Sequence, residues 1–243
     1  MKTEKMINQP KYIFTLFLII LFSCSDTVIK IPEGFVEIDP PKHNSHEWFL
    51  LYSSDNQFHV EKANDELKII NGVRSNELKL SLSDGQLIGV DEGEWGGQLT
   101  FVPKDSTKLP FEVKSGNINH LFSYKDEIYL IDGLSHMGYD KGALYKLNIF
   151  KDTITYDLVE EFDSNPKAFT IYNEKYYIIS NKYFIVIDNQ KKDTIIDGRY
   201  WNFLNPNSIV VFDDNNIFFG MKGAFAKVNK NYKSIKFYKK IKN

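Results

Sequence analysis

A polar turn followed by an apolar strand recurs four times along this chain at nearly constant spacing. The strands after these turns begin at Gln86, Ile128, Tyr176 and Ile217, which lie 42, 48 and 41 residues apart. Repeats of about 40–48 residues with four strands each are typical of β-propeller blades, since a single four-stranded sheet cannot cover both of its faces. The spacing therefore predicts an all-β fold built from stacked, similar sheets.

The repeat predicts a β-propeller of five blades. Four full units are expected at 77–116, 117–165, 166–205 and 206–237, and a shorter one at 47–75, in which 48–53 and 57–60 would form a hairpin. Asn165-Pro166 and Asn205-Pro206 open two successive units and support this register. A six-bladed propeller and a β-sandwich of short strands remain as alternatives.

Charge near the two ends of the chain supports closure of the ring. Residues 33–66 contain eight acidic residues, whereas residues 222–243 contain eight lysines and no acidic residue. The first and last blades of a ring are neighbours, so these opposite charges should meet. The lysines could instead form a basic patch for an anionic lipid or polymer.

The first 24 residues have the layout of a secretory signal. Three lysines precede an apolar stretch at 12–22, which ends in Leu21-Phe22-Ser23-Cys24 and is too short to span a bilayer comfortably. This pattern resembles the lipobox of bacterial lipoproteins. The resemblance implies that residues 1–23 are removed and that the thiol of Cys24 carries acyl chains that hold the protein on a membrane. The alternative is an ordinary secretory peptide with a chance cysteine.

These observations predict the organisation and location of the protein. Residues 1–23 are the expected signal peptide, residues 24–45 a tether with one closing strand, and residues 46–243 the propeller domain. The domain would face the periplasm or the cell surface from a bacterial envelope membrane. With Cys24 acylated, the mature chain has no free thiol for a disulfide, a zinc site or a nucleophile. Its net charge of about −4 gives no sign of nucleic-acid binding.

Three short motifs carry a family resemblance. Gly93-Glu94-Trp95-Gly96-Gly97, Pro206-Asn207-Ser208 and Phe219-Gly220-Met221 resemble a recurring set in uncharacterised bacterial propeller-like lipoproteins. That family has no established activity, so the resemblance implies a fold and no cofactor.

A looser resemblance is to the gluconolactonase and senescence-marker propellers, in which a Pro-Asn-Gly turn supplies a metal-binding asparagine. It implies an alternative function, a metal-assisted hydrolase or lactonase with Glu77, His120 and Asn207 near the metal. In this chain the glycine of that turn is replaced by Ser208.

The loops that enter the first strand of a blade and those that join its second and third strands share one face. Two of the latter loops are expected to be long, 91–97 and 132–142, and would bring Asp132 and Asp140 over one sector of the rim. The predicted register places Glu47 with other polar residues at the starts of the innermost strands. The expected ligand-binding residues on this face are Glu77, Glu94, Trp95, His120, His136, Lys167 and Asn207.

Each of these residues also has a structural interpretation. Trp95, between glycines, could stack on a ligand or fold back onto a neighbouring blade. His120 and His136 could be a metal pair or separate polar residues of the rim. The innermost strands 119–124, 168–172 and 208–212 contain no acidic residue, and no nucleophile elbow, His-Glu-x-x-His or phosphate loop occurs. The sequence therefore favours a lipid-anchored protein that binds a ligand or an envelope protein over an enzyme.

Overall fold

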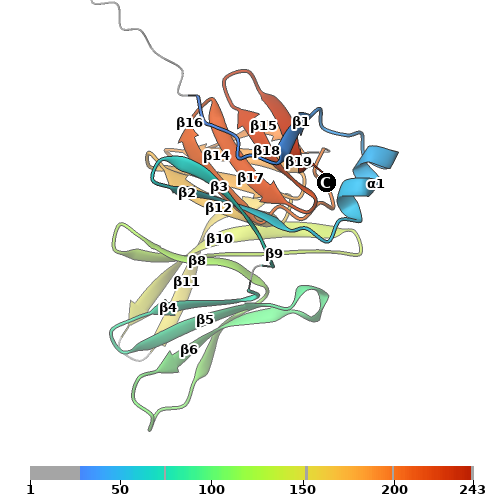
Figure 1. The fold of residues 1–243 in the computed structure, drawn as a ribbon. Coiled ribbons are helices and arrows are strands. Elements are labelled where there is room, and N and C mark those ends of the chain that lie inside the picture. Colours follow the sequence, from blue (N-terminus) through green and yellow to red (C-terminus); the bar gives the residue numbers. More distant parts are fainter. Residues whose placement is uncertain (1–27, 74, 151–152, 199, 242–243) are drawn as a thin grey trace, which may run out of the picture.

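The protein is an all-β molecule made of several four-stranded antiparallel sheets (Figure 1). The structure, a computed structural model, describes residues 28–73, 75–150, 153–198 and 200–241. The expected signal peptide and Cys24 lie outside these residues. The first sheet comprises β4 (Glu77–Ser81), β5 (Gly85–Asp91), β6 (Gly97–Pro103) and β7 (Phe111–Ser115). The second comprises β8 (Ile118–Tyr124), β9 (Glu127–His136), β10 (Tyr139–Phe150) and β11 (Thr153–Phe162).

The remaining strands form two more sheets and a hairpin. The third sheet comprises β12 (Pro166–Tyr172), β13 (Lys175–Ser180), β14 (Tyr183–Asp188) and β15 (Lys191–Asp197). The fourth comprises β16 (Ser208–Asp213), β17 (Asn216–Met221), β18 (Ala224–Asn229) and β19 (Ser234–Lys240), with β1 (Phe35–Ile38) added beside β19. The hairpin consists of β2 (Phe58–Ala63) and β3 (Glu66–Asn71). The four full units expected from the sequence are confirmed.

The tight turns expected from the sequence have a specific backbone conformation. Both central residues have positive φ at Lys125-Asp126 and at Asn173-Glu174, and the same holds at Asn64-Asp65 in the short hairpin. Turns of this kind twist in the same sense as the strands that they join, so they close two-residue hairpins without distorting the sheet. The polar turn residues thus set the register of the repeats.

Apolar clusters hold each sheet against the next along the chain. Leu87 and Leu99 of the first sheet pack with Leu130 and Leu147 of the second. Ile131, Leu144 and Phe162 of the second sheet pack with Ile178 and Ile185 of the third. The largest cluster joins the third and fourth sheets through Tyr177, Phe184, Phe219 and Phe237. Hairpin β2–β3 lies on the outer face of the fourth sheet, where Val60 and Leu67 meet Phe218 and Phe225.

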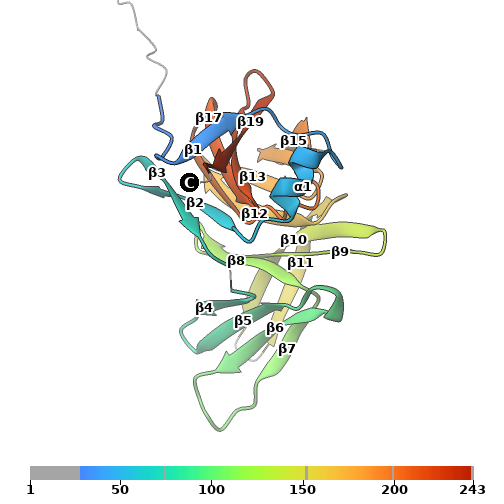
Figure 2. The same cartoon turned by 45° about the vertical axis from the view of Figure 1, so that its right-hand side comes forward.

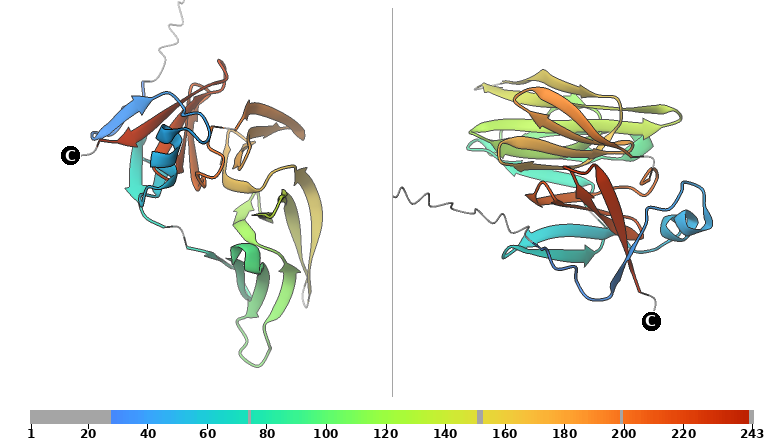
Figure 3. Two further views of the ribbon diagram at one scale, coloured as in Figure 1. Left: turned by 90° about the vertical axis from the view of Figure 1, so that its right-hand side faces the viewer. Right: turned by 90° about the horizontal axis from the view of Figure 1, so that it is seen from above.

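The sheets form an open arc rather than a closed ring (Figure 3). Hairpin β2–β3 and the sheet β4–β7 are its two ends. Exposed side chains at both ends are mostly polar: Glu77 and Lys79 alternate with partly buried leucines on β4, and Glu61 and Lys68 are exposed on the hairpin, together with Ile70. Burial of apolar surface therefore gives little drive to close the ring. The predicted fifth blade is only this two-stranded unit.

The expected hairpin at 48–60 is wrong, because the chain forms helix α1 (His46–Tyr52) there. The Ser45 side chain accepts a hydrogen bond from Trp48 N at 3.2 Å and caps the helix. Trp48 and Leu51, three residues apart on one helix face, are buried in the cluster between the third and fourth sheets (Figure 2). Glu47 accordingly lies in the first turn of α1 and not at the start of an innermost strand. No helix among the described residues is long and apolar enough to cross a membrane.

The closing strand expected in 24–45 is confirmed as β1. It pairs antiparallel with β19, the outermost strand of the last sheet. The opposite charges of the two chain ends meet there, since Lys236 Nζ lies 2.7 Å from Asp39 and 3.7 Å from Glu37, and the Tyr238 hydroxyl donates to Glu37. These exposed ion pairs add little stability individually, but they place β1 at the last sheet.

Candidate functional site

A repeated Asn-x-x segment opens the innermost strands of three successive sheets. The segments are Asn117-Ile118-Asn119, Asn165-Pro166-Lys167 and Asn205-Pro206-Asn207. The register shifts between Ile118 and His120 and again between Pro166 and Ala168, so each of these two strands gains one extra residue at the same place. A β-bulge re-aims a side chain, and Asn119 and Lys167 lie at these two bulges. Asn207 precedes the first residue of β16, whose register shift lies further along, between Val211 and Asp213.

The third residues line a central cavity of about 260 Å³ on the loop-bearing face of the domain. Asn119, Lys167 and Asn207 come from the three Asn-x-x segments, and His59 comes from hairpin β2–β3. The other lining residues belong to the connection into the first sheet and to neighbouring strand ends: Gln57, Val73, Ser75, Asn76, Leu78, Asp91, Ile118, Asn205 and Pro206. The polar part of the lining thus consists of five amides, one histidine, one lysine, one aspartate and one serine, and four apolar side chains complete it.

Hydrogen bonds hold several of these side chains in place. Asn119 Nδ2 donates to Asn165 Oδ1 and to the Pro166 carbonyl, both at 2.7 Å, and both asparagines are buried. His59 Nε2 lies 2.7 Å from the Gly72 carbonyl. Asn207 Oδ1 accepts from Ser208 Oγ at 2.8 Å, but its Nδ2 is buried and has no hydrogen-bond partner among the described residues. Such an unsatisfied donor is costly and calls for an explanation.

A second group of predicted residues lies on the rim, away from the central cavity. Glu94 and Trp95 belong to the short helix η1 (Gly93–Trp95), and His136 Nδ1 lies 3.1 Å from Glu94 Oε2. The side chain of Trp95 is 84% exposed, so its interpretation as core packing is wrong. Met137 and Tyr139, at the tip of hairpin β9–β10, are exposed beside this pair. We call Glu94, Trp95, His136, Met137 and Tyr139 the rim cluster.

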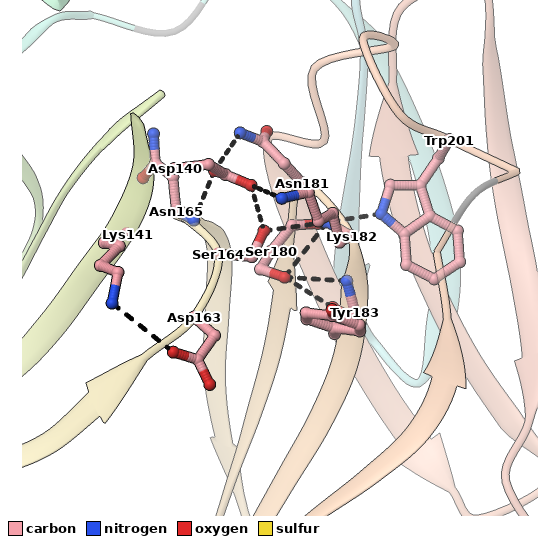
Figure 4. Close-up of polar contacts among 10 residues, drawn as sticks. All are labelled: Asp140, Lys141, Asp163, Ser164, Asn165, Ser180, Asn181, Lys182, Tyr183 and Trp201. Carbon is pink, nitrogen blue, oxygen red and sulfur yellow. Dashed lines mark hydrogen bonds and ion pairs between the residues drawn. The ribbon is translucent and has the colours of Figure 1, made fainter. Parts of the chain in front are cut away.

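Residues 132–142 are the end of the long hairpin β9–β10 rather than a loop, and their two aspartates join neighbouring sheets. Asp140 accepts hydrogen bonds from Asn165 N (2.9 Å), Asn181 Nδ2 (3.0 Å) and Ser164 Oγ (3.0 Å), and pairs with Lys182 Nζ at 3.0 Å (Figure 4). Burial disfavours the charge on Asp140, but these donors outweigh it and hold the pKa of its carboxyl below the ordinary value.

Asp132 has the equivalent position between the first and second sheets. Its Oδ2 lies 2.5 Å from Nζ of the buried Lys114, and its Oδ1 accepts from Ala143 N at 3.0 Å. Both aspartates therefore join neighbouring sheets through ion pairs and hydrogen bonds.

The structure separates the residues that the sequence grouped into one site. Lys167 and Asn207 line the central cavity, whereas Glu77 pairs with Lys79 at 2.7 Å and His120 packs beside Phe169, and neither lines it. In the described part of the chain, no group of three or more His, Cys, Asp or Glu side chains is close enough to hold a metal ion. Glu77 and His120 thus do not share the central cavity with Asn207, and the metal set expected from these three residues stays a prediction.

Sequence reasoning missed His59 and Asn119. His59 was missed because helix α1 shifts the register of the first hairpin. Asn119 was missed because the bulge at the start of β8 turns it, and not His120, toward the cavity. A signal was present in the sequence: Asn117-Ile118-Asn119 is a third copy of the pattern recognised at Asn165 and Asn205.

The search of protein-family models and of curated proteins found no match to this chain. The propeller-like family suggested by the Gly93–Gly97 and Pro206–Ser208 motifs is therefore not identified. What the structure supports is the coarser statement, an all-β fold of four-stranded sheets compatible with propeller blades.

Proposed function

We propose that this protein is a lipid-anchored binding protein of the bacterial cell envelope that holds a small polar ligand in the central cavity. The observation that carries the proposal is the buried, unpartnered Nδ2 of Asn207 in a cavity lined by amides. Because Nδ2 exposes less than 1 Å², a ligand acceptor would reach it only with a shift of the neighbouring side chains. A binding site with a few polar groups of fixed orientation is the usual form of small-molecule recognition.

The chemistry of the lining restricts the ligand. Lys167 and Asp91 contribute one charge each, and the remaining polar groups are donors and acceptors from asparagine, glutamine, serine and histidine. Val73, Leu78 and Ile118 add a small apolar wall. This combination suits a neutral or zwitterionic molecule with many hydrogen-bonding groups, such as a sugar or a short peptide.

The cavity proposal predicts stabilisation by the ligand. A panel of neutral sugars, amino acids and short peptides would be screened by thermal unfolding. A ligand present at 100 times its dissociation constant adds about 2.7 kcal/mol to the free energy of unfolding, which for a domain of this size raises the Tm by about 5–10 °C. Asn207→Leu should abolish this shift and change the stability of the free protein by about 1 kcal/mol or less, since it loses one hydrogen bond and one unsatisfied donor.

The rim cluster provides the matched control, and it is also where a protein partner would bind. Exposed tryptophan, tyrosine and methionine are enriched at protein interfaces. Trp95→Ala should leave the ligand-induced shift intact, because Trp95 does not line the cavity. If Trp95→Ala abolishes the ligand-induced shift and Asn207→Leu does not, the ligand does not bind in the central cavity. That result would favour a binding partner at the rim cluster.

The membrane location rests on the Leu21–Cys24 pattern and gives an independent prediction. Cys24→Ala should abolish labelling with radioactive palmitate and release the protein from the membrane fraction, since the acyl chains supply the anchoring energy. The Tm of the domain should not change, because Cys24 lies outside the repeated units of the sequence. Palmitate labelling that persists in the variant would refute the anchor.

A further inference from the structure

An apolar cleft of about 340 Å³ opens between the sheets β4–β7 and β8–β11. It lies between the β6–β7 loop and the end of hairpin β10–β11. Its lining is mostly apolar (Phe101, Pro103, Leu109, Phe111, Ile149, Phe150 and Ile154) but also includes Asp84, Asp105, Lys108 and Thr153. Leu109 is 85% exposed and Phe150 is 58% exposed. Clustered apolar side chains at a surface mark a site of interaction with another apolar body.

The cleft lies on the side of the domain opposite α1 and the rim cluster. We call this side the turn face, because it carries the turns β2–β3, β4–β5 and β8–β9 and the β6–β7 loop, all on the left in Figure 1. The described chain also begins on the turn face, at the start of the segment 28–34 (Figure 1). Ile29 and Ile31 of that segment pack against the cluster formed by hairpin β2–β3 and the fourth sheet, which fixes the segment on the domain.

The short connection to Cys24 determines which face can lie near a membrane. Cys24 is four residues before Val28, and a chain spans at most about 3.6 Å per residue, so the two Cα atoms lie within about 14 Å of each other. Acyl chains on Cys24 would therefore keep the bilayer close to the hairpin β2–β3 end of the turn face. The cleft lies at the other end of the arc, so it meets the bilayer when the whole turn face lies flat on the membrane. We call the opposite side, which carries α1 and the rim cluster, the loop face. Met137 and Trp95 of the rim cluster are also exposed, but they lie on the side away from the bilayer.

We propose that the cleft is a membrane-docking surface, and that Leu109, Phe111 and Phe150 insert into the outer part of the bilayer that holds the acylated Cys24. This inference rests on the lipid anchor of the proposed function. Insertion transfers exposed apolar area out of water, which is favourable without any basic patch. Docking at this surface holds the central cavity on the opposite side, open to the aqueous compartment where a soluble ligand arrives.

The test places a dye at single positions of the full-length acylated protein. Cys24 is the only cysteine of the chain, and acylation blocks its thiol, so a cysteine introduced by Leu109→Cys or Phe150→Cys is labelled alone with an environment-sensitive fluorophore. The protein is then reconstituted into phosphatidylcholine vesicles with or without acyl chains that carry a nitroxide quencher. Met137→Cys, on the loop face and 93% exposed, is the matched control.

The expected result is a blue-shifted emission, quenched by the nitroxide lipids, for the dye at positions 109 and 150 and neither effect at position 137. Leu109→Glu should reduce the lipid quenching of the dye at position 150 to the level at position 137, because a buried charge opposes insertion.

Two readouts separate the anchor from the docking surface. Protein that floats with the vesicles but shows no lipid quenching at positions 109 and 150 overturns the docking surface and leaves the anchor standing. Protein that does not float overturns both. A dye at position 109 that is shielded from aqueous iodide and yet not quenched by lipid would mean that a second copy of the chain covers the cleft, and would also overturn the proposal.

Discussion

Deletion of residues 206–243 should unfold the entire domain. These residues form β16–β19, which supply one wall of the largest apolar cluster, including Phe219 and Phe237. Without them the third sheet exposes Tyr177 and Phe184, β1 loses the strand with which it pairs, and hairpin β2–β3 loses its supporting sheet. We expect loss of the near-ultraviolet circular dichroism and of a cooperative thermal transition.

A deletion at the end of the arc is the matched control. Replacing 75–116, which include the sheet β4–β7, by a short Gly-Ser linker should leave a cooperative transition at lower Tm. In the described residues this sheet packs on β8–β11 through one apolar cluster and the Lys114–Asp132 pair, and it takes no part in the largest cluster. The linker can be short, since Val73 and Ile118 line the same cavity. If both deletions abolish the transition, the domain behaves as a closed ring; a truncated 1–205 protein with a sharp melt would contradict the role of the fourth sheet.

The repeat predicted the sheets well because turn chemistry and strand pattern agree locally. Asp126 and Asn173 mark turns whose positive φ values the structure shows, and the apolar strands that follow them form the buried centres of the sheets. Ring closure was harder to predict, because it depends on which face of β4 meets a neighbour. Glu77 and Lys79 alternate with Leu78 and Leu80, and this pattern indicates one covered face only.

The candidate site was predicted only in part, since its geometry depends on bulges that no composition signal reveals. Because of the one-residue bulge at the start of β8, Asn119 lines the cavity and His120 does not. Lys167 and Asn207 were placed correctly, because the Asn-Pro pairs before them fix the start of each strand. The roles of Asp132 and Asp140 depend on Lys114 and Lys182 of adjacent sheets, and such long-range pairing cannot be read from spacing along the chain.

Replacement of Asp140 by alanine should cost about 2–4 kcal/mol of unfolding free energy. The change leaves Asn165 N, Asn181 Nδ2 and Ser164 Oγ without their acceptor at the junction of the second and third sheets, and it removes the ion-pair partner of Lys182. The magnitude follows from the loss of charged hydrogen bonds at the largely buried Asp140 side chain. The cost stays below that of a fully buried ion pair, because the Lys182 side chain is about half exposed and can be hydrated in the variant. Urea unfolding of both proteins measures the difference.

The pH dependence of this difference identifies the carboxylate as its source. The pKa of Asp140 is lower in the folded protein than the unfolded value of about 3.9, so its stabilising contribution is fully present above that pH and is lost as the pH falls through the folded pKa. The stability gap between the wild type and Asp140→Ala should be constant from pH 7 to about 5 and shrink below about 4. Asp163→Ala removes a nearby exposed ion pair with Lys141, 3.8 Å apart, and should change stability by less than about 0.5 kcal/mol. Equal losses in the two variants, or a gap that widens in acid, would show that Asp140 does not hold the two sheets together as a charged acceptor.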